Sequence, residues 1–172
     1  MKAGNIKVKK SAPYRIIGAL YILKQEELKK VFGRKVASED FFLAFLKYGN
    51  YEEFHYWHLT AQHQDCVDYI ASLNLSAELR SKIKCFAIEQ VTEIMPKYQY
   101  YAFLSGDPNC EWLAYFRAFY AQNKFPIVGI FHTISDASSK LLFHKLSRQL
   151  QPYDSMVCTS SDQRSVIANI LS

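Results

Sequence analysis

The sequence has few cysteines, and none of them is arranged as a metal-binding or redox pair. Cys66, Cys85, Cys110 and Cys158 are scattered along 172 residues, and no CxxC motif is present. Scattered thiols of this kind are typical of proteins in a reducing compartment, where disulfides do not persist. The sequence therefore predicts free thiols and a cytoplasmic location.

The sequence also lacks a long apolar run. The stretch from Ile16 to Leu23 is far shorter than the roughly 18 residues that a membrane-spanning helix needs. The basic opening residues 1–12 are not followed by an apolar run of the length found in signal peptides, so we expect a flexible basic tail before a single domain of residues 13–172. The net charge of +5 includes no stripe of Lys and Arg. We therefore expect no binding to nucleic acid, and peripheral association with a membrane stays open.

Three motifs of nucleotide and hydrolase chemistry are missing. The sequence contains neither the P-loop GxxxxGK[ST], nor the GxSxG of serine hydrolases, nor the dinucleotide-binding GxGxxG. After the first predicted strand, Lys24 to Glu27 stand where glycines would let a pyrophosphate approach the backbone. We expect no resident cofactor and no metal.

Short apolar runs do alternate with amphipathic segments, and this alternation is typical of βαβ units. It predicts an α/β fold of three layers with a mostly parallel sheet of about six strands. The predicted strands are Tyr14 to Ile22, Glu53 to His58, Lys84 to Glu89, Tyr100 to Leu104, Ile127 to His132 and Ser155 to Thr159. The predicted helices are Ala37 to Gly49, with Ser38 as N-cap and Gly49 as its end, and Gln62 to Leu73, Ala77 to Lys82, Cys110 to Asn123, Ser138 to Leu150 and Ser161 to Leu171.

Polar residues follow three of these strands. Asp107 comes after the fourth strand, His132 and Ser135 follow the fifth, and Ser160 follows the sixth and precedes a helix. The carboxyl ends of parallel strands border the crevice in which ligands bind, so these residues are candidates for one site. For Ser135 and Ser160 the alternative is a plain helix cap, whereas an imidazole just beyond a strand favours function.

Two other groupings are interpreted as structural. His55, His58, His63 and Cys66 offer four metal-ligand types, but their spacing does not suit one tetrahedral site, so we expect structural or surface roles. Cys158 lies inside an apolar strand, which argues against a nucleophilic pair with His132. An aromatic stripe of Trp112, Tyr115, Phe116 and Phe119 lies at helical spacing and is expected in the core, rather than as a stacking surface.

Three segments carry a resemblance to a known family. They are Gly33 to Gly49 with Glu52 to His55, then Phe125-Pro-Ile-Val-Gly-Ile-Phe-His-Thr-Ile-Ser135, then Leu150-Gln-Pro-Tyr-Asp-Ser-Met-Val-Cys-Thr-Ser160 with Arg164. Together they resemble the amino-terminal domain of GT-B glycosyltransferases of group 1, also called family 4. The likeness spans about Tyr14 to Leu171.

The resemblance implies the acceptor-side half of a retaining enzyme that moves a sugar from a nucleotide-sugar to an unknown acceptor. His132 matches the family's histidine near the donor sugar, and Gly33 with Arg34 matches the loop that borders the interdomain cleft. Ser160 matches a position close to that cleft. The family's carboxyl-terminal domain binds the nucleotide, and this sequence stops before such a domain, so we expect the chain alone to be inactive.

Two other classes of function stay open. A binding or interaction module could self-associate or recruit a partner through the exposed cleft face. A small α/β enzyme with its own chemistry at His132 would have Asp107 and Asp136 as its only evident acidic helpers.

Overall fold

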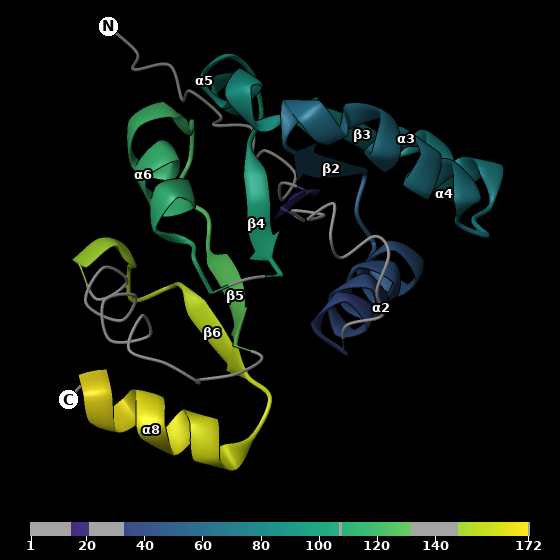
Figure 1. Ribbon diagram of the computed structural model, residues 1–172. Helices are drawn as coiled ribbons and strands as arrows, with labels where there is room; N and C mark the ends of the chain where they lie inside the picture. The colour runs from purple at the N-terminus through teal and green to yellow at the C-terminus, as the bar shows by residue number, and fades with distance from the viewer. Residues whose placement is uncertain (1–14, 21–32, 107, 132–147, 172) are drawn as a thin grey trace, which may run out of the picture.

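The structure is a computed structural model that describes residues 15–20, 33–106, 108–131 and 148–171. Its centre is one sheet of six parallel strands in the order β3-β2-β1-β4-β5-β6 (Figure 1). The strands are β1 (Ile16–Leu20), β2 (Glu53–His58), β3 (Ile83–Ala87), β4 (Tyr100–Ser105), β5 (Ile127–Phe131) and β6 (Ser155–Cys158). This is the strand order of doubly wound Rossmann-type domains, and the predicted fold class is confirmed.

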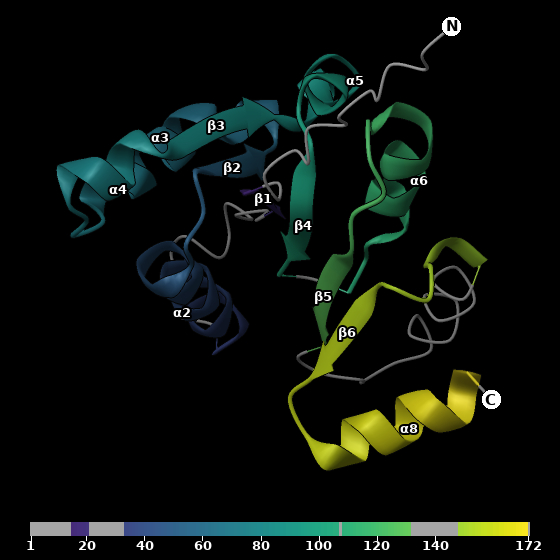
Figure 2. The same cartoon turned by 180° about the vertical axis from the view of Figure 1, so that it is seen from behind.

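Helices cover both faces of the sheet. They are α2 (Gly33–Tyr48), α3 (His63–Ser72), α4 (Ala77–Ser81), α5 (Val91–Ile94), α6 (Glu111–Tyr120) and α8 (Ser161–Leu171), with three short 3-10 turns at Thr60–Gln62, Ile88–Gln90 and Met95–Lys97. The two views show α2 and α3 on one side of the strands and α5 and α6 on the other (Figures 1 and 2). The chain therefore forms the predicted three layers.

Two apolar cores fill the spaces between these layers. Strand β2 supplies both, because successive side chains of a strand point to opposite faces. Phe54 and Tyr56 pack with Leu46 of α2, while Trp57 packs with Leu113 of α6 on the other face. Because both faces of the sheet are covered, the strand sequences are largely apolar and do not alternate between apolar and polar residues.

Most predicted elements are confirmed. Strand β2 and helix α8 have the predicted bounds, and α3, α4 and α6 differ from them by one to three residues at their ends. The helix predicted from Ser138 to Leu150 lies mostly outside the described residues. Among the described residues, no helix has the length and apolar character needed to cross a membrane.

Two boundaries are corrected. Helix α2 begins at Gly33, so Ser38 lies inside it and is not its N-cap, although the helix does end before Gly49 as predicted. The third strand ends at Ala87 and not at Glu89, because the backbone N–H of Ala87 donates to the side-chain oxygen of Gln90 (3.0 Å) and starts a helical turn. The helical segment that follows was not predicted.

Helix α6 also differs from expectation. Its buried residues are Leu113, Ala114 and Arg117, whereas Tyr115 and Phe119 are 50% and 67% exposed. The predicted aromatic stripe is therefore only partly in the core. Leu113 and Ala114 let the helix approach the sheet more closely than bulky rings would, and the buried Arg117 pairs with an aspartate, which the sequence did not reveal.

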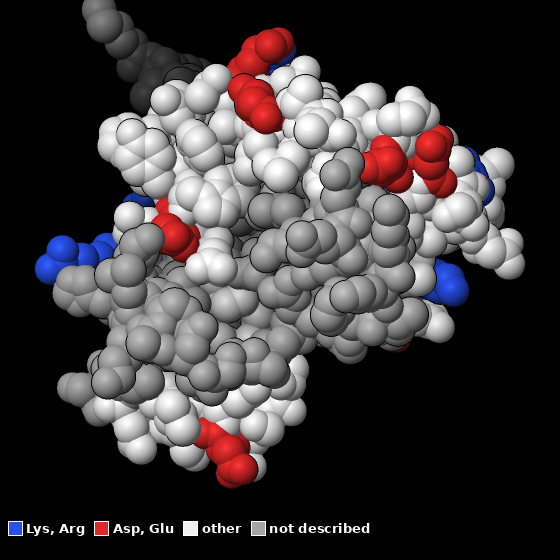
Figure 3. Space-filling view, in the orientation of Figure 1, with Lys and Arg blue, Asp and Glu red and all other residues white. Residues whose placement is uncertain are grey.

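Charged side chains are spread over the surface shown in Figure 3. Within the described residues on this face, Lys and Arg form no continuous stripe, and the acidic groups lie at several separate places, singly or two together. The net charge of +5 is therefore not concentrated on this part of the surface.

Candidate functional site

The carboxyl ends of β1 and β4 lie side by side at the point where the strand order reverses. Leu20 is paired with Ser105, and the N–H of Gly106 donates to the carbonyl oxygen of Leu20 (3.4 Å). From β1 the chain continues to α2 on one face, and from β4 it continues to α6 on the other. In open α/β sheets this reversal is where ligands bind.

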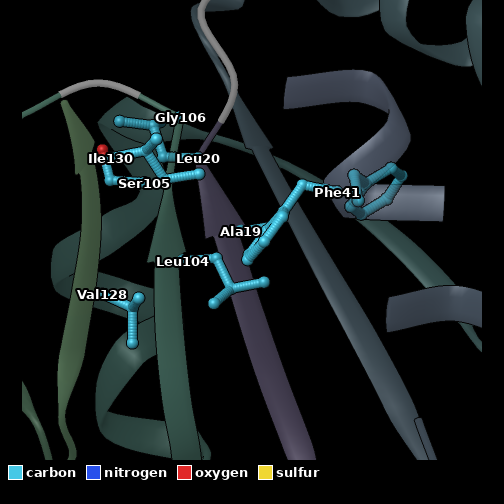
Figure 4. A pocket seen from close by; sticks show the side chains of 9 residues that line it. Ala19, Leu20, Phe41, Leu104, Ser105, Gly106, Val128 and Ile130 are labelled. Carbon is cyan, nitrogen blue, oxygen red and sulfur yellow. The ribbon is translucent and has the colours of Figure 1, made fainter. Parts of the chain in front are cut away.

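A small hollow of about 30 Å³ lies at this point (Figure 4). It is lined by Ala19, Leu20, Phe41, Phe42, Leu104, Ser105, Gly106, Val128 and Ile130. Figure 4 shows Leu104 and Ala19 on neighbouring strands, with Phe41 on the helix beside them. The lining is apolar except for the buried Ser105, and the volume suits little more than one water molecule. The hollow thus forms an apolar floor at the strand edge rather than a complete substrate pocket.

The ends of β5 and β6 continue the same edge. These strands are parallel neighbours, with Phe131 paired to Cys158. His132 is the next residue after Phe131 in the sequence, and Ser160 lies two residues beyond Cys158. His132, Ser135 and Asp107 fall outside the described residues, so their positions in the site stay predictions.

Ser160 acts as a helix cap. Its hydroxyl oxygen accepts the backbone N–H of Gln163 (3.2 Å). The side chain of Gln163 reaches back and accepts hydrogen bonds from the N–H and the hydroxyl of Thr159 (3.1 and 3.0 Å). These reciprocal bonds satisfy amides at the start of α8. The capping alternative for Ser160 is thus observed, and a role in binding substrate stays a prediction.

Gly33 and Arg34 lie in the first turn of α2 and not in a loop before it. The resemblance implied a loop at Gly33, and the helix was expected to start only at Ala37, with Ser38 as its N-cap. Helix α2 contributes Phe41 and Phe42 to the hollow at the end of β1. The side chain of Arg34 is not described, and its contact with a substrate stays a prediction.

A pair of histidines lies at the end of β2, on the same edge of the sheet. His58 donates from Nδ1 to the carbonyl oxygen of Leu59 (2.8 Å), so its Nε2 accepts the Nδ1 proton of the exposed His63 (3.0 Å). Within the described part of the chain, no group of three His, Cys, Asp or Glu side chains suits a metal ion. The two imidazoles are thus hydrogen-bonded to each other at the end of β2.

An acidic side chain lies beside this pair. The hydroxyl of Thr60, after β2, donates to the carboxylate of Glu89, after β3. This bond lowers the pKa of Glu89. The two loops are thus joined at the outer part of the edge, and sequence reasoning did not single out either residue.

A second polar network lies at the opposite, amino edge of the sheet. The carboxylate of Glu53 only accepts, so Nε2–H of His55 donates to it (2.8 Å) and Nδ1 of His55 accepts the hydroxyl proton of Tyr100 (2.8 Å). Lys84 donates to the other oxygen of Glu53 (2.7 Å). The sequence signal for this network was the spacing of Glu53 and His55, which puts both side chains on one face of β2.

The environment of this network keeps His55 neutral. Burial lowers the pKa of His55 more than its bond to Glu53 raises it. Burial also raises the pKa of Tyr100. For Glu53, burial acts to raise the pKa, but hydrogen bonds from Lys84 and His55 outweigh it and hold the pKa low. A buried neutral histidine with both nitrogens satisfied has a structural role here.

The fold and the strand edge together define a doubly wound α/β domain of the Rossmann type, with its candidate site at the carboxyl ends of β1, β4, β5 and β6. Comparison of the chain with models of known protein families and with curated proteins gives no match. A fold of this class hosts many unrelated activities, so function must be argued from the residues at that edge.

Proposed function

We propose that this chain is the amino-terminal, acceptor-side half of a retaining GT-B glycosyltransferase. Its substrates would be a nucleotide-sugar and an acceptor that carries a hydroxyl group. The acceptor oxygen bonds to the anomeric carbon, the bond from that carbon to the nucleotide diphosphate breaks, and the acceptor proton is released. The products are the glycosylated acceptor and a nucleoside diphosphate.

One observation carries this proposal. The segments Phe125 to Ser135 and Leu150 to Ser160, which carry the more specific part of the resemblance, contain β5 and β6, and these are parallel neighbours. Strands β5 and β6 both end at the carboxyl edge, and β5 is the neighbour of β4, where the strand order reverses. That edge is where a second domain would close over the reacting groups in an enzyme of this class.

His132 has the central role in the proposed chemistry. It follows the last residue of β5, so its imidazole would meet the donor sugar at the strand edge. Ser135, Ser160 and Asp107 would contribute polar contacts to the substrates from the same edge. Arg34 in the first turn of α2 would approach the cleft from the other face of the sheet.

The donor diphosphate needs positive groups or backbone amides to stabilise the charge that develops as it leaves. The hollow at the strand edge is apolar and holds one buried hydroxyl, that of Ser105. Its described lining residues therefore give no such stabilisation, and we propose that a donor-binding domain supplies it.

The test is a sugar-transfer assay with UDP-, GDP- and ADP-sugars. The chain is assayed alone and after it is joined to the donor-binding domain encoded downstream or in a neighbouring gene. We expect release of nucleoside diphosphate only from the joined protein. Turnover by the chain alone, or no donor-binding domain in either place, would contradict the proposal.

The apolar strand edge also favours a second candidate, an interaction module. Of the residues that line the hollow at that edge, Leu20, Leu104 and Ile130 are buried and Phe41 is 36% exposed. The ring of Phe41 is the part of this lining that could contact another chain or a second copy. Size-exclusion chromatography with light scattering separates the two candidates. A strict monomer with no bound partner weakens the module, and a stable self-associated form favours it.

A further inference from the structure

A second hollow lies at the amino edge of the sheet, far from the candidate reaction site. It has a volume of about 480 Å³ and is bounded by the carboxyl-terminal half of α6, the loop from α6 to β5, and the segment before β6. Both ribbon views show that segment beside α6 (Figures 1 and 2). Pockets that bind small ligands are typically about 300–1000 Å³, so this hollow, called the amino-edge groove below, is large enough for one.

The walls of the amino-edge groove are held in place by buried polar bonds. Arg117 donates to both carboxylate oxygens of Asp154 (2.5 and 2.8 Å) and to the carbonyl oxygen of Phe125 (2.8 Å). The Asn123 amide bonds both the N–H and the carbonyl oxygen of Tyr100 (3.0 and 2.7 Å). These bonds fix the two loops to α6 and β4, and a preformed groove loses little conformational entropy when a ligand binds.

The described lining of the groove is rich in carboxamides with remaining hydrogen-bonding capacity. Gln149 and Gln151 are exposed and make no side-chain hydrogen bond within the described part of the chain. Gln122 donates from its amide nitrogen to the carbonyl oxygen of Pro96, and its oxygen faces no described donor. A carboxamide can both donate and accept, as a hydroxyl group can. Three such groups suit a ligand with several hydroxyls.

The charge of the groove argues against an ionic ligand. The positive charge of Arg117 is balanced by Asp154, whose side chain is 1% exposed. Lys124 is then the one unbalanced charged side chain among the described lining residues. A single exposed lysine gives weak attraction for an anion, and it repels a cation.

Tyr153 adds an aromatic surface to the groove. The guanidinium carbon of Arg117 lies 5.1 Å from the centroid of its ring, and Tyr153 is still 41% exposed. The negative face of an aromatic ring attracts the weakly positive C–H groups of a sugar ring. An aromatic ring beside several amides is thus suited to a pyranose, whose faces carry C–H groups and whose rim carries hydroxyls.

From this chemistry we infer that the amino-edge groove binds a neutral oligosaccharide. The groove precedes β5 and β6, whereas the proposed transfer site follows them, so the bound sugar lies at the opposite end of the strands from the reaction. It is a second carbohydrate site, which would hold a glycan without reacting with it. The inference does not depend on sugar transfer, because binding can be measured on the chain alone.

The experiment is a titration of the ¹⁵N-labelled chain, followed by NMR. The probes are maltohexaose, cellohexaose, mannohexaose and chitohexaose, with inorganic phosphate as the anionic probe. We expect at least one oligosaccharide to bind with a dissociation constant of about 1 mM or tighter. The shifted amides should be those of residues 114–124 and 149–153, and phosphate should leave them unchanged.

Two variants place the binding in the groove. Ala118 is exposed in the lining, so Ala118→Trp fills the groove without entering the core, and we expect it to weaken binding by about tenfold or more. Ala71→Trp, on the exposed surface of α3, is the matched control and should bind as the original chain does. The double change Gln149→Ala with Gln151→Ala removes the free amides and should also weaken binding.

Three results would overturn the inference. The first is that none of the four oligosaccharides shifts the groove amides. The second is that phosphate shifts them and the sugars do not. The third is that Ala118→Trp and the double glutamine variant bind a sugar as tightly as Ala71→Trp does. Because no nucleotide-sugar is present, none of these results bears on the proposed transferase function.

Discussion

Arg117 on α6 and Asp154, the residue before β6, form a two-pronged ion pair with both side chains almost fully buried. The side chains are 5% and 1% exposed, and the two N···O distances are 2.5 and 2.8 Å. Asp154 also accepts the backbone N–H of Ile127 (2.7 Å) and of Gln151 (2.8 Å). One carboxylate thus joins α6, the start of β5 and the approach to β6.

Removal of one partner from this pair should be strongly destabilising. Arg117→Met leaves a buried carboxylate without its cation, and we expect a loss of about 3–5 kcal/mol in the free energy of unfolding. Urea denaturation measures it. The control is Lys97→Met in the exposed pair with Glu93, where the expected loss is below about 1 kcal/mol. Equal losses at the two sites would show that Arg117 is not the tether described here.

Stability should fall as the solution becomes mildly acidic, in part through His55. Its pKa in the folded chain lies below the ordinary value of about 6.5 because it is buried, so the unfolded chain binds more protons. Its contribution is therefore complete above that value and is lost as the pH falls below it. Glu53, whose pKa is also low, adds a loss at more acid pH, below about 4.3.

The variant His55→Gln tests this assignment. We expect the melting temperature of the original chain to fall between about pH 7 and pH 5, and the fall to be smaller in the variant. The titratable groups that contact His55 are Glu53, Tyr98 and Tyr100, with Lys84 bound to Glu53, and all are unchanged in the variant. An identical pH dependence in both proteins would refute the role of His55.

Two glycines in the sheet should tolerate a methyl group differently. A Cβ at Gly18 would lie 2.2 Å from a ring carbon of the buried Phe103, whereas a Cβ at Gly129 would lie 2.6 Å from the sulfur of Met156. Methionine is flexible and a packed ring is not. We expect Gly18→Ala to cost about 1–3 kcal/mol and Gly129→Ala to cost less. The urea concentrations at which the two variants unfold measure this difference. A larger loss of stability in Gly129→Ala than in Gly18→Ala would be inconsistent with this packing.

The cap of α8 should contribute measurably to stability. Ser160→Ala removes the acceptor for the N–H of Gln163, and the expected loss is about 1 kcal/mol. Ser165→Ala is the matched control on the same helix, because the Ser165 hydroxyl only donates back to the carbonyl oxygen of Ser161 (3.1 Å). That change should be neutral or slightly stabilising. If the two variants unfold at the same urea concentration, Ser160 does not cap the helix.

The sequence predicted the sheet well because its central strands β1, β2, β4 and β5 are mostly buried on both faces. Continuous apolar runs such as Ile127 to Phe131 are typical of central strands. The parallel direction followed from the helices between the strands. The buried face of α6 was not predicted, because it depends on tertiary packing. The rings of Tyr115 and Phe119 suggested a core stripe, but they are exposed. The helix instead buries Arg117, whose partner Asp154 lies 37 residues away in the sequence.

The candidate site was predicted only in outline. Strand ends could be located from the apolar runs, and the carboxyl edge followed from parallel pairing. The network of Glu53, His55 and Tyr100 could not be predicted from the sequence, because Tyr100 is 45 residues from His55. The two side chains come into contact only because β2 and β4 lie on either side of β1 in the sheet. Single-residue propensities contain no information about such contacts.

The most direct test of the central proposal is the rate of sugar transfer by the His132→Ala variant. The chain is joined to its donor-binding domain, and release of nucleoside diphosphate is followed with UDP-, GDP- and ADP-sugars, with His63→Ala as the control at the outer part of the same edge. The proposal predicts a loss of about a hundredfold or more for His132→Ala and little change for His63→Ala. A full transfer rate in His132→Ala would contradict it.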